Sequence, residues 1–410
     1  MIRTKKQPLM AFVAVATSLL ACTTAKADAV CEWNTKVGEI IVNAKMGPPP
    51  ANRTMAIVNT AVYEAVNAIT KRYPADTLKL EAAPGTSVDA AIAAANRTAL
   101  SKLLPSQQVA IDLAYRAALS KIADGAAKNS GIAVGEQAAA AVLVARADDG
   151  AVAVETYRPQ TSTGVYVPTV LPAAPHWPQR KPWLMSNPAQ FRPGPPPALT
   201  SPLWARDFNE IKALGSKSNS RRTAEQTQIA SFWEATLPPV YTGIVLSVAE
   251  APGREITQNA RLFAAVAQAA DDALVAVFDA KYHYNFWRPV TAIRNGDLDG
   301  NDATERDASW TPFIETPLHP EYPCAHCTVA GAVGTVVQAE IGRGSLPPLA
   351  TTSYLIKGPA RKWAKTDEFM QEVAKARIYD GVHFRNSTEV GTAMGKQVGA
   401  LAVAKFLAAE

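Results

Sequence analysis

The sequence predicts an all-α protein built from helical bundles, and three observations support this prediction. Apolar residues recur at three- and four-residue steps through several long stretches, which is the spacing of one helix face. Alanine, the strongest helix former, is abundant in those stretches. Runs that alternate β-branched and polar residues, the pattern of half-buried strands, are scarce. With 410 residues and 48% hydrophobic composition, the chain has room for a large core and two or three domains.

The first 27 residues have the pattern of a secretory signal peptide. A basic start (residues 3–6), an apolar stretch (residues 9–20) and a small-x-small site at residues 25–27 follow one another. The apolar stretch is too short to cross a bilayer. We therefore expect cleavage near Ala27 and a periplasmic or secreted protein. The alternative is a lipoprotein anchored at Cys22, which ends an imperfect lipoprotein box.

Residues 28–155 form a predicted N-terminal helical region. Its first strong pattern starts at the three prolines of residues 48–50 and continues at helical spacing to Ile69. Proline suits the first turn of a helix, where its missing N–H has no intrahelical partner to lose. Glycine or proline separates the following stretches. These predict helices over Val88–Leu104, Ser106–Ala123 and Ala133–Ala147.

Residues 156–205 form a proline-rich connecting segment. Residues 159–202 hold 12 of the 30 prolines, which excludes helix and central strand. Trp177, Trp183 and Phe191 lie in the same stretch, and such large aromatic residues favour packing against a surface. A plain linker is the alternative.

Residues 206–410 form the predicted catalytic helical bundle. Periodicity predicts helices over Trp204–Ser216, Thr223–Thr236 and Ile256–Phe286, from near His326 to about Glu340, and from near His383 to the C-terminus. No stretch after the leader reaches 18 uncharged apolar residues, so we expect no transmembrane segment.

The charge of the chain argues against two classes of partner. The formal net charge is +5, but the leader contributes four basic residues and no acid, so the remainder carries +1. A nearly neutral body is not expected to bind nucleic acid or an anionic membrane as its main partner.

Three short segments contain the candidate catalytic and anion-binding residues. In the first, Lys281 and Arg288 are seven residues apart, which is two turns and one face of a continuous helix. Pro289 is expected to end or kink that helix. Two cations on one face of an alanine-rich helix suit a bound anion, although a pair of surface cations is the alternative.

The other two segments each place a histidine at a helix start. His326 follows Pro323, and His383 follows an Asp-Gly turn signal. Free backbone N–H groups at a helix start form an anion site. Arg377 ends the preceding helix, and a break at Gly381 would let Arg377 and His383 converge.

Together the segments predict a pocket with three fixed cations, two imidazoles and helix N-termini. That set suits a tetrahedral oxyanion such as phosphate or vanadate. Taken singly, each histidine fits a structural, hydrogen-bonded role as well. Cys324 and Cys327 do not predict a zinc site, because no second cluster of Cys or His supplies the remaining ligands.

In this order the segments resemble the signature of the superfamily of vanadium-dependent haloperoxidases and type-2 phosphatidic acid phosphatases. Its pattern is Lys-x6-Arg-Pro, then Pro-Ser-Gly-His, then Ser-Arg-x5-His-x3-Asp. The resemblance is specific over about residues 256–400. Two flanking stretches, Pro-Pro-Pro-x4-Met-Ala-Ile-Val-Asn and Leu-Pro-Ser-Gln-Gln, also look like bacterial vanadium haloperoxidase-like proteins. The resemblance implies an all-α fold of helical bundles.

The resemblance implies a role for each site residue. His383 would be the ligand to vanadium, or the nucleophile of a phosphatase, and His326 would be the acid–base group. The backbone N–H of Ala325 would hydrogen-bond an oxygen of the oxyanion. Lys281 would also polarise the activated peroxide. The cations that would neutralise the oxyanion are Lys281, Arg288 and Arg377.

Two departures from the family pattern bear on function. Cys324 stands where the family has serine, so its thiol would be a weaker donor to the oxyanion. Cys324 and Cys327 could instead form a disulfide in an exported protein, and both states stay open. Ser387 replaces the aspartate four residues after the last histidine. The missing carboxylate would leave His383 differently oriented, which weakens the case for phosphohistidine chemistry.

Three functions stay open. The first is an exported vanadate-dependent haloperoxidase that oxidises halide with hydrogen peroxide and halogenates a small organic acceptor. By resemblance, His319 implies bromide or iodide. The second is an acid phosphatase that needs no metal and acts on a phosphomonoester through a phosphohistidine. The third is a degenerate homologue that binds oxyanion without turnover. Large all-α members often dimerise, so a homodimer is a further expectation.

Overall fold

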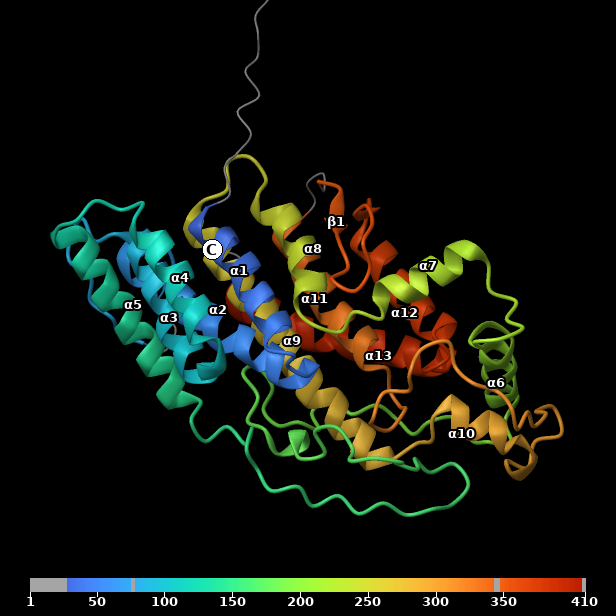
Figure 1. Ribbon diagram of the computed structural model, residues 1–410. Helices are drawn as coiled ribbons and strands as arrows, with labels where there is room; N and C mark the ends of the chain where they lie inside the picture. The colour runs from blue at the N-terminus through green and yellow to red at the C-terminus, as the bar shows by residue number, and fades with distance from the viewer. Residues whose placement is uncertain (1–27, 75–77, 343–346, 408–410) are drawn as a thin grey trace, which may run out of the picture.

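The computed structural model describes residues 28–74, 78–342 and 347–407. The expected signal peptide and Cys22 lie outside them. Within the described residues the chain folds into thirteen α-helices and one two-stranded β-ladder, which confirms the predicted all-α class (Figure 1). The ladder pairs β1 (Leu349–Thr351) with β2 (Arg361–Trp363) in antiparallel register.

The helices fall into an N-terminal and a C-terminal set. The first comprises α1 (Ala29–Asn43), α2 (Pro48–Thr70), α3 (Val88–Leu103), α4 (Gln108–Leu119) and α5 (Ala126–Ala145). The second comprises α6 (Pro202–Leu214), α7 (Ala224–Trp233), α8 (Pro239–Ala249), α9 (Ile256–Tyr284), α10 (Pro289–Arg294), α11 (Ala325–Ile341), α12 (Thr366–Tyr379) and α13 (Arg385–Ala402).

Small residues let the N-terminal helices pack closely. The helix α5 lies against α3, and a side chain at Gly131 or Gly135 would meet backbone oxygens of Ser87 or Ala91 at 2.3 and 2.2 Å. Most alanines of α3 are buried as well. Close contact between the helix backbones therefore stabilises this packing, in addition to the burial of apolar surface.

The long helix α9 lies at the centre of the molecule. It is buried on nearly all sides, and its buried residues include the charged Asp271, Asp272 and Lys281 as well as apolar ones. The helix α2 packs against it, and α11 and α13 pack against it as well (Figure 1). Because α9 ends at Tyr284, its last turn delivers Lys281 to the region where the C-terminal helices meet.

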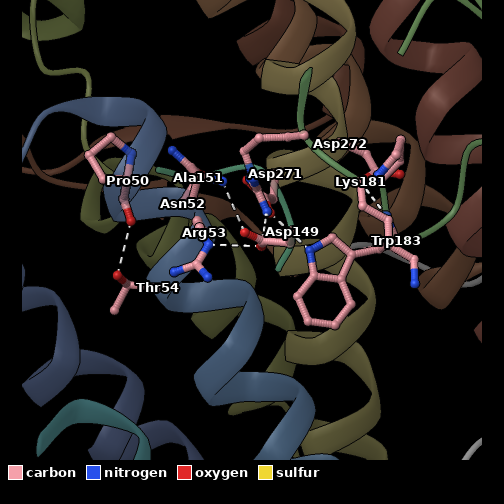
Figure 2. A network of polar contacts seen from close by, with 12 residues as sticks. Pro50, Asn52, Arg53, Thr54, Asp149, Ala151, Lys181, Trp183, Asp271 and Asp272 are labelled. Carbon is pink, nitrogen blue, oxygen red and sulfur yellow. Dashed lines mark hydrogen bonds and ion pairs between the residues drawn. The ribbon is translucent and has the colours of Figure 1, made fainter. Parts of the chain in front are cut away.

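The proline-rich segment has no α-helix and is fixed to the protein by buried charges (Figure 2). Arg180 of this segment bonds Asp149 and Asp271, at 2.7 Å each. Arg53 of α2 also bonds Asp149, and the Trp183 indole donates to Asp271. The segment therefore packs against a surface, as its aromatic residues predict, and is not a plain linker.

Several helix boundaries differ from those that periodicity predicts. The helix α5 begins at Ala126 instead of Ala133, and α9 stops at Tyr284 because Asn285 adopts a left-handed conformation. The expected continuous helix to Phe286 is therefore wrong. Among the described helices, none is long and apolar enough to span a membrane.

Candidate oxyanion site

Two of the three segments singled out in the sequence, those of His326 and His383, line one cavity of about 370 Å³. Its lining includes Ala325, His326, Arg377, His383 and His319. The start of α2, at residues 48–52, forms part of the opposite wall. Apolar surface predominates in the lining, so charged groups in the cavity face a partly dry environment.

Lys281 and Arg288 come from two different helices. Lys281 lies in the last turn of α9, whereas Arg288 is the N-cap residue of α10, which begins at Pro289. The expectation that both cations share one face of a continuous helix is therefore wrong. Pro289 starts a helix instead of ending one, which is where proline is best tolerated.

Both cations are buried and bonded to neutral groups. The Lys281 ammonium donates to the carbonyls of Pro320 and Glu321, at 2.9 and 2.8 Å. The Arg288 guanidinium donates to the carbonyls of His319 and Val382. Burial and the neighbouring Arg288 charge hold the pKa of Lys281 well below its usual value. Burial lowers the pKa of Arg288 to about 10.

A glycine turn brings Arg377 and His383 together. Gly381 has a φ of +80°, and the backbone N–H groups of Val382 and His383 both bond the carbonyl of Arg377 at 3.2 Å. The predicted break at Gly381 is therefore confirmed. Arg377 is also paired with Asp380 at 2.6 Å. Burial raises the pKa of Asp380 to about 7, although the Arg377 charge opposes that rise.

The His383 ring has a carboxylate partner from another segment. Its Nδ1 lies 2.8 Å from Oε1 of Glu321, and the Phe384 backbone N–H donates to the same oxygen. The expectation that His383 lacks an orienting carboxylate is thus wrong. The group comes from 62 residues earlier in the chain rather than from four residues later. The His383 Nε2 atom lies 3.3 Å from Arg288.

The start of α11 presents two backbone N–H groups beside the cavity. Ala325 and His326 occupy the first two positions of this helix, where no intrahelical acceptor exists. Cys324 caps the helix: its sulfur accepts the Cys327 N–H. The two cysteines form a disulfide, so of the two open states the paired one is observed. Cys324 consequently has no thiol to donate to an oxyanion, and its expected weak donation is wrong.

His326 has a different environment from His383. Its Nε2 has no partner among the described residues, and its ring bonds the Ala235 carbonyl. Burial lowers the pKa of His326 well below its usual value, and the Arg377 charge adds to this effect. The imidazole is thus neutral near neutral pH, with one nitrogen able to take up a proton.

His319 borders both the cavity and the cation cluster. Its Nδ1 lies 3.0 Å from Arg288, and its ring packs on Phe278 at 5.1 Å between centroids. Burial lowers the pKa of His319 well below its usual value, followed by the Lys281 and Arg288 charges. A neutral imidazole accepts a hydrogen bond from the guanidinium, which fixes the planes of both groups.

The charges of the site fit an oxyanion. Lys281 and Arg288 have no carboxylate within salt-bridge distance among the described residues. Burial raises the pKa of Glu321 to about 7, so this carboxyl only partly offsets the cations. A compact multivalent anion beside His383 would bond the cationic groups and the α11 N–H groups. The donors present therefore suit vanadate or phosphate.

The structure brings the seven predicted site residues to one place. Arg377, His326, His383 and Ala325 line the cavity, while Lys281 and Arg288 bond the chain segments behind it. Their roles stay predictions. Sequence reasoning missed Glu321, Asp380 and Tyr241, whose hydroxyl bonds the His326 carbonyl. One feature of the sequence could have identified Glu321, because this acid directly precedes the Tyr-Pro-Cys-Ala-His motif.

Comparison with known proteins connects this geometry to one family. The family model described as the VCPO second helical-bundle domain matches residues 261–409. Vanadium chloroperoxidase of Curvularia inaequalis is 29% identical over 145 residues, which covers 30% of this chain and 24% of that protein. The chain thus matches about a quarter of the length of this curated relative.

Two solved structures are similar over nearly the whole chain. A crystal structure described as that of the first bacterial vanadium-dependent iodoperoxidase is 25% identical, with a TM-score of 0.79. The match covers 92% of this chain and 95% of the other. A holo-type bacterial vanadium-dependent chloroperoxidase has a TM-score of 0.71 over 93% and 98% of the two chains. At 17% identity, that second likeness shows the fold alone.

Proposed function

We propose that this chain is a vanadate-dependent haloperoxidase, on the premise that its residues 261–409 match the VCPO second helical-bundle domain and that its fold is similar to that of a bacterial vanadium-dependent iodoperoxidase. It would oxidise halide with hydrogen peroxide. The observation that supports this most directly is the arrangement around His383. A carboxylate holds one ring nitrogen, and the other faces a cluster of buried cations.

The residues of the site divide into one ligand and several anion-binding groups. His383 would bind vanadium through Nε2, because its Nδ1 is engaged by Glu321. Lys281, Arg288 and Arg377 would neutralise the vanadate oxygens. The Ala325 N–H at the start of α11 would donate to one of them. Bound vanadate supplies a Lewis-acidic centre that activates hydrogen peroxide.

The protein contributes proton transfer, charge and exclusion of water. His326 takes a proton from incoming peroxide at Nε2, which has no competing partner among the described residues. The buried Lys281 ammonium would place positive charge near the bound oxyanion and stabilise negative charge there. The apolar wall, which includes Leu274 and Phe278, limits access of water to these groups.

We further propose bromide or iodide as the halide and a small organic molecule as the acceptor. The resemblance supports this preference through His319, which borders the cavity. A structural relative at 25% identity is described as an iodoperoxidase, which is in keeping with the same preference.

An acid phosphatase acting on phosphomonoesters is the second candidate. One observation favours it: Glu321 supplies the orienting carboxylate that a nucleophilic His383 needs. The same cations would hold the phosphoryl oxygens, and His326 would protonate the leaving group. Phosphate and vanadate have similar charge and shape, so the cavity suits both.

One experiment separates the candidates. Protein comprising residues 28–410 is freed of phosphate, and orthovanadate is added to half of it. Both halves are assayed for peroxide-dependent bromination of a dye and for hydrolysis of an aryl phosphate. Bromination that requires vanadate supports the haloperoxidase. Metal-free hydrolysis inhibited by vanadate makes it a phosphatase, and inactivity in both assays indicates a degenerate site.

We also propose export to the periplasm or beyond the cell, with cleavage near Ala27. The disulfide of Cys324 and Cys327 supports an oxidising compartment. Mass spectrometry of the N-terminal peptide, from both the membrane-free and the membrane fraction, tests this. A lipid-modified Cys22 at the N-terminus would support the lipoprotein alternative instead. Light scattering of the same preparation tests the expected homodimer.

A further inference from the structure

The short segment His319–Glu321 bonds three groups of the site at once. The His319 carbonyl accepts from Arg288 at 2.8 Å, and the carbonyls of Pro320 and Glu321 accept from Lys281. The side chain of Glu321, fully buried, reaches His383. This segment therefore fixes the two cations and the imidazole relative to one another.

The partners of His383 define which ring nitrogen carries the proton. A carboxylate at 2.8 Å from Nδ1 accepts a hydrogen bond, so Nδ1 carries the proton. Arg288 lies 3.3 Å from Nε2, and a guanidinium can only donate. The Arg288 contact therefore requires a lone pair at Nε2, and a neutral ring with that lone pair carries its proton at Nδ1. The assignment follows from the partners on both sides of the ring.

We propose that Glu321 is a positioning residue that holds His383 in the Nδ1–H form and leaves Nε2 free to bind the oxyanion's central atom. It replaces an acid four residues after the histidine. Ser387 occupies that position, and its Oγ lies 3.5 Å from Nδ1, which is too long for an effective hydrogen bond. The role in vanadate binding rests on the proposed function, whereas the protonation form of His383 does not.

Four variants test the proposal. Glu321→Ala removes the acceptor, while Glu321→Gln keeps an amide oxygen of the same shape. Ser387→Ala is the matched control, because it removes the other polar group near Nδ1. The double variant Glu321→Ala with Ser387→Asp moves the carboxylate to residue 387, whose side chain lies near the same Nδ1 atom. That rescue is informative because a purely structural loss at residue 321 would not be repaired from residue 387.

Two measurements report on His383: the protonation of its imidazole and the binding of vanadate. Nitrogen-15 spectra of histidine-labelled protein report which nitrogen of each imidazole is protonated, and the chain has five histidines. His383→Gln assigns the relevant signal. Equilibrium dialysis with orthovanadate gives the dissociation constant without any assay of turnover.

We expect the Nδ1–H form in the wild type, in Ser387→Ala and in Glu321→Gln. We expect its loss in Glu321→Ala, with vanadate binding weakened about 10–100-fold, the range typical for partners of metal-bound histidines. The double variant should regain both properties. An Nε2–H signal in the wild type, or unchanged binding in Glu321→Ala, would overturn the proposal. A wild type that binds vanadate but oxidises no halide would contradict the haloperoxidase and leave this result intact.

Discussion

The two imidazoles of the site have opposite surroundings. His383 is held by Glu321 on one side and Arg288 on the other. His326 bonds a backbone carbonyl, and its Nε2 has no partner in the described part of the chain. A ring held by a carboxylate at Nδ1 keeps its Nε2 lone pair for a ligand, and a ring with one open nitrogen suits proton transfer. Their difference gives each histidine a separate, testable role.

Replacing His326 with alanine is expected to separate turnover from binding. The variant loses the group that moves the proton, so the rate constant kcat should fall about 10²–10⁴-fold, the usual contribution of general acid–base catalysis. The vanadate dissociation constant should change little, because His383 and the cations remain. Steady-state bromination measures kcat, and equilibrium dialysis measures the vanadate dissociation constant. His283→Ala, which changes an exposed imidazole, is the control. Retained bromination in His326→Ala would contradict the acid–base assignment.

The residues of the site could be predicted from sequence only where a motif carries them. Lys281, His326 and His383 stand at fixed spacings within their own segments. Glu321 could not be paired with His383 in this way, because the two lie 62 residues apart and meet only when α11 and α13 pack. Contacts within a segment follow from spacing, whereas contacts between segments depend on the fold.

At the scale of elements, the crossing of α11 and α13 determines how two site segments meet. Gly391, Gly395 and Gly399 of α13 lie against the backbone of α11. A side chain at Gly395 would lie 1.9 Å from the Thr328 carbonyl oxygen. No side-chain rotation relieves a clash with backbone, so the helices must separate.

We therefore expect Gly395→Ala to lower the free energy of unfolding by about 1–3 kcal/mol or more, as overpacking does in a dense core. Urea denaturation followed by circular dichroism measures the effect. Gly358→Ala is the matched control, since a side chain there meets nothing within 4 Å. Equal denaturation midpoints for the two variants would mean that α11 and α13 are not tightly packed at Gly395.

The disulfide at the start of α11 makes a simple chemical prediction. Cys324 and Cys327 are paired, and Cys31 is the free cysteine of the described residues. Alkylation of the denatured, unreduced protein of residues 28–410 should therefore modify one cysteine, and three after reduction. Mass spectrometry counts the labels. Three labels before reduction would show free thiols at the oxyanion site.

The sequence predicts where helices occur more accurately than it predicts the residues at which they begin and end. Periodicity predicts α3 almost to the residue, because Ser87 caps it and its apolar face is continuous. The end of α9 depends on the left-handed Asn285, and nothing in the apolar pattern marks that residue. The helix α8 is apolar around most of its circumference, so no period identifies it. The domain boundaries at 156 and 206 stay predictions.

For the whole molecule, the buried charges beneath the proline-rich segment join distant parts of the chain. Arg180 bonds Asp149 near the end of α5 and Asp271 in the middle of α9. Asp272 accepts the backbone N–H groups of Trp183, Leu184 and Met185. A segment without helix or sheet thus satisfies its backbone donors with a carboxylate. The attachment of the segment depends on groups whose ionisation changes with pH.

Asp272 is expected to give stability a distinct pH dependence. Burial raises its pKa to about 6, against 3.8 ordinarily, although the Trp183 N–H opposes the rise. Between these pH values the folded protein keeps a proton that the unfolded chain releases, so the free energy of unfolding falls as pH rises, by about 3 kcal/mol in total.

Asp272→Asn removes this contribution. Urea midpoints measured from pH 4 to 7 should therefore show a flatter slope in Asp272→Asn than in the wild type, with Asp367→Asn, an exposed carboxylate, as the unchanged control. Parallel slopes in all three proteins would mean that Asp272 ionises in the folded protein as it does in the unfolded chain.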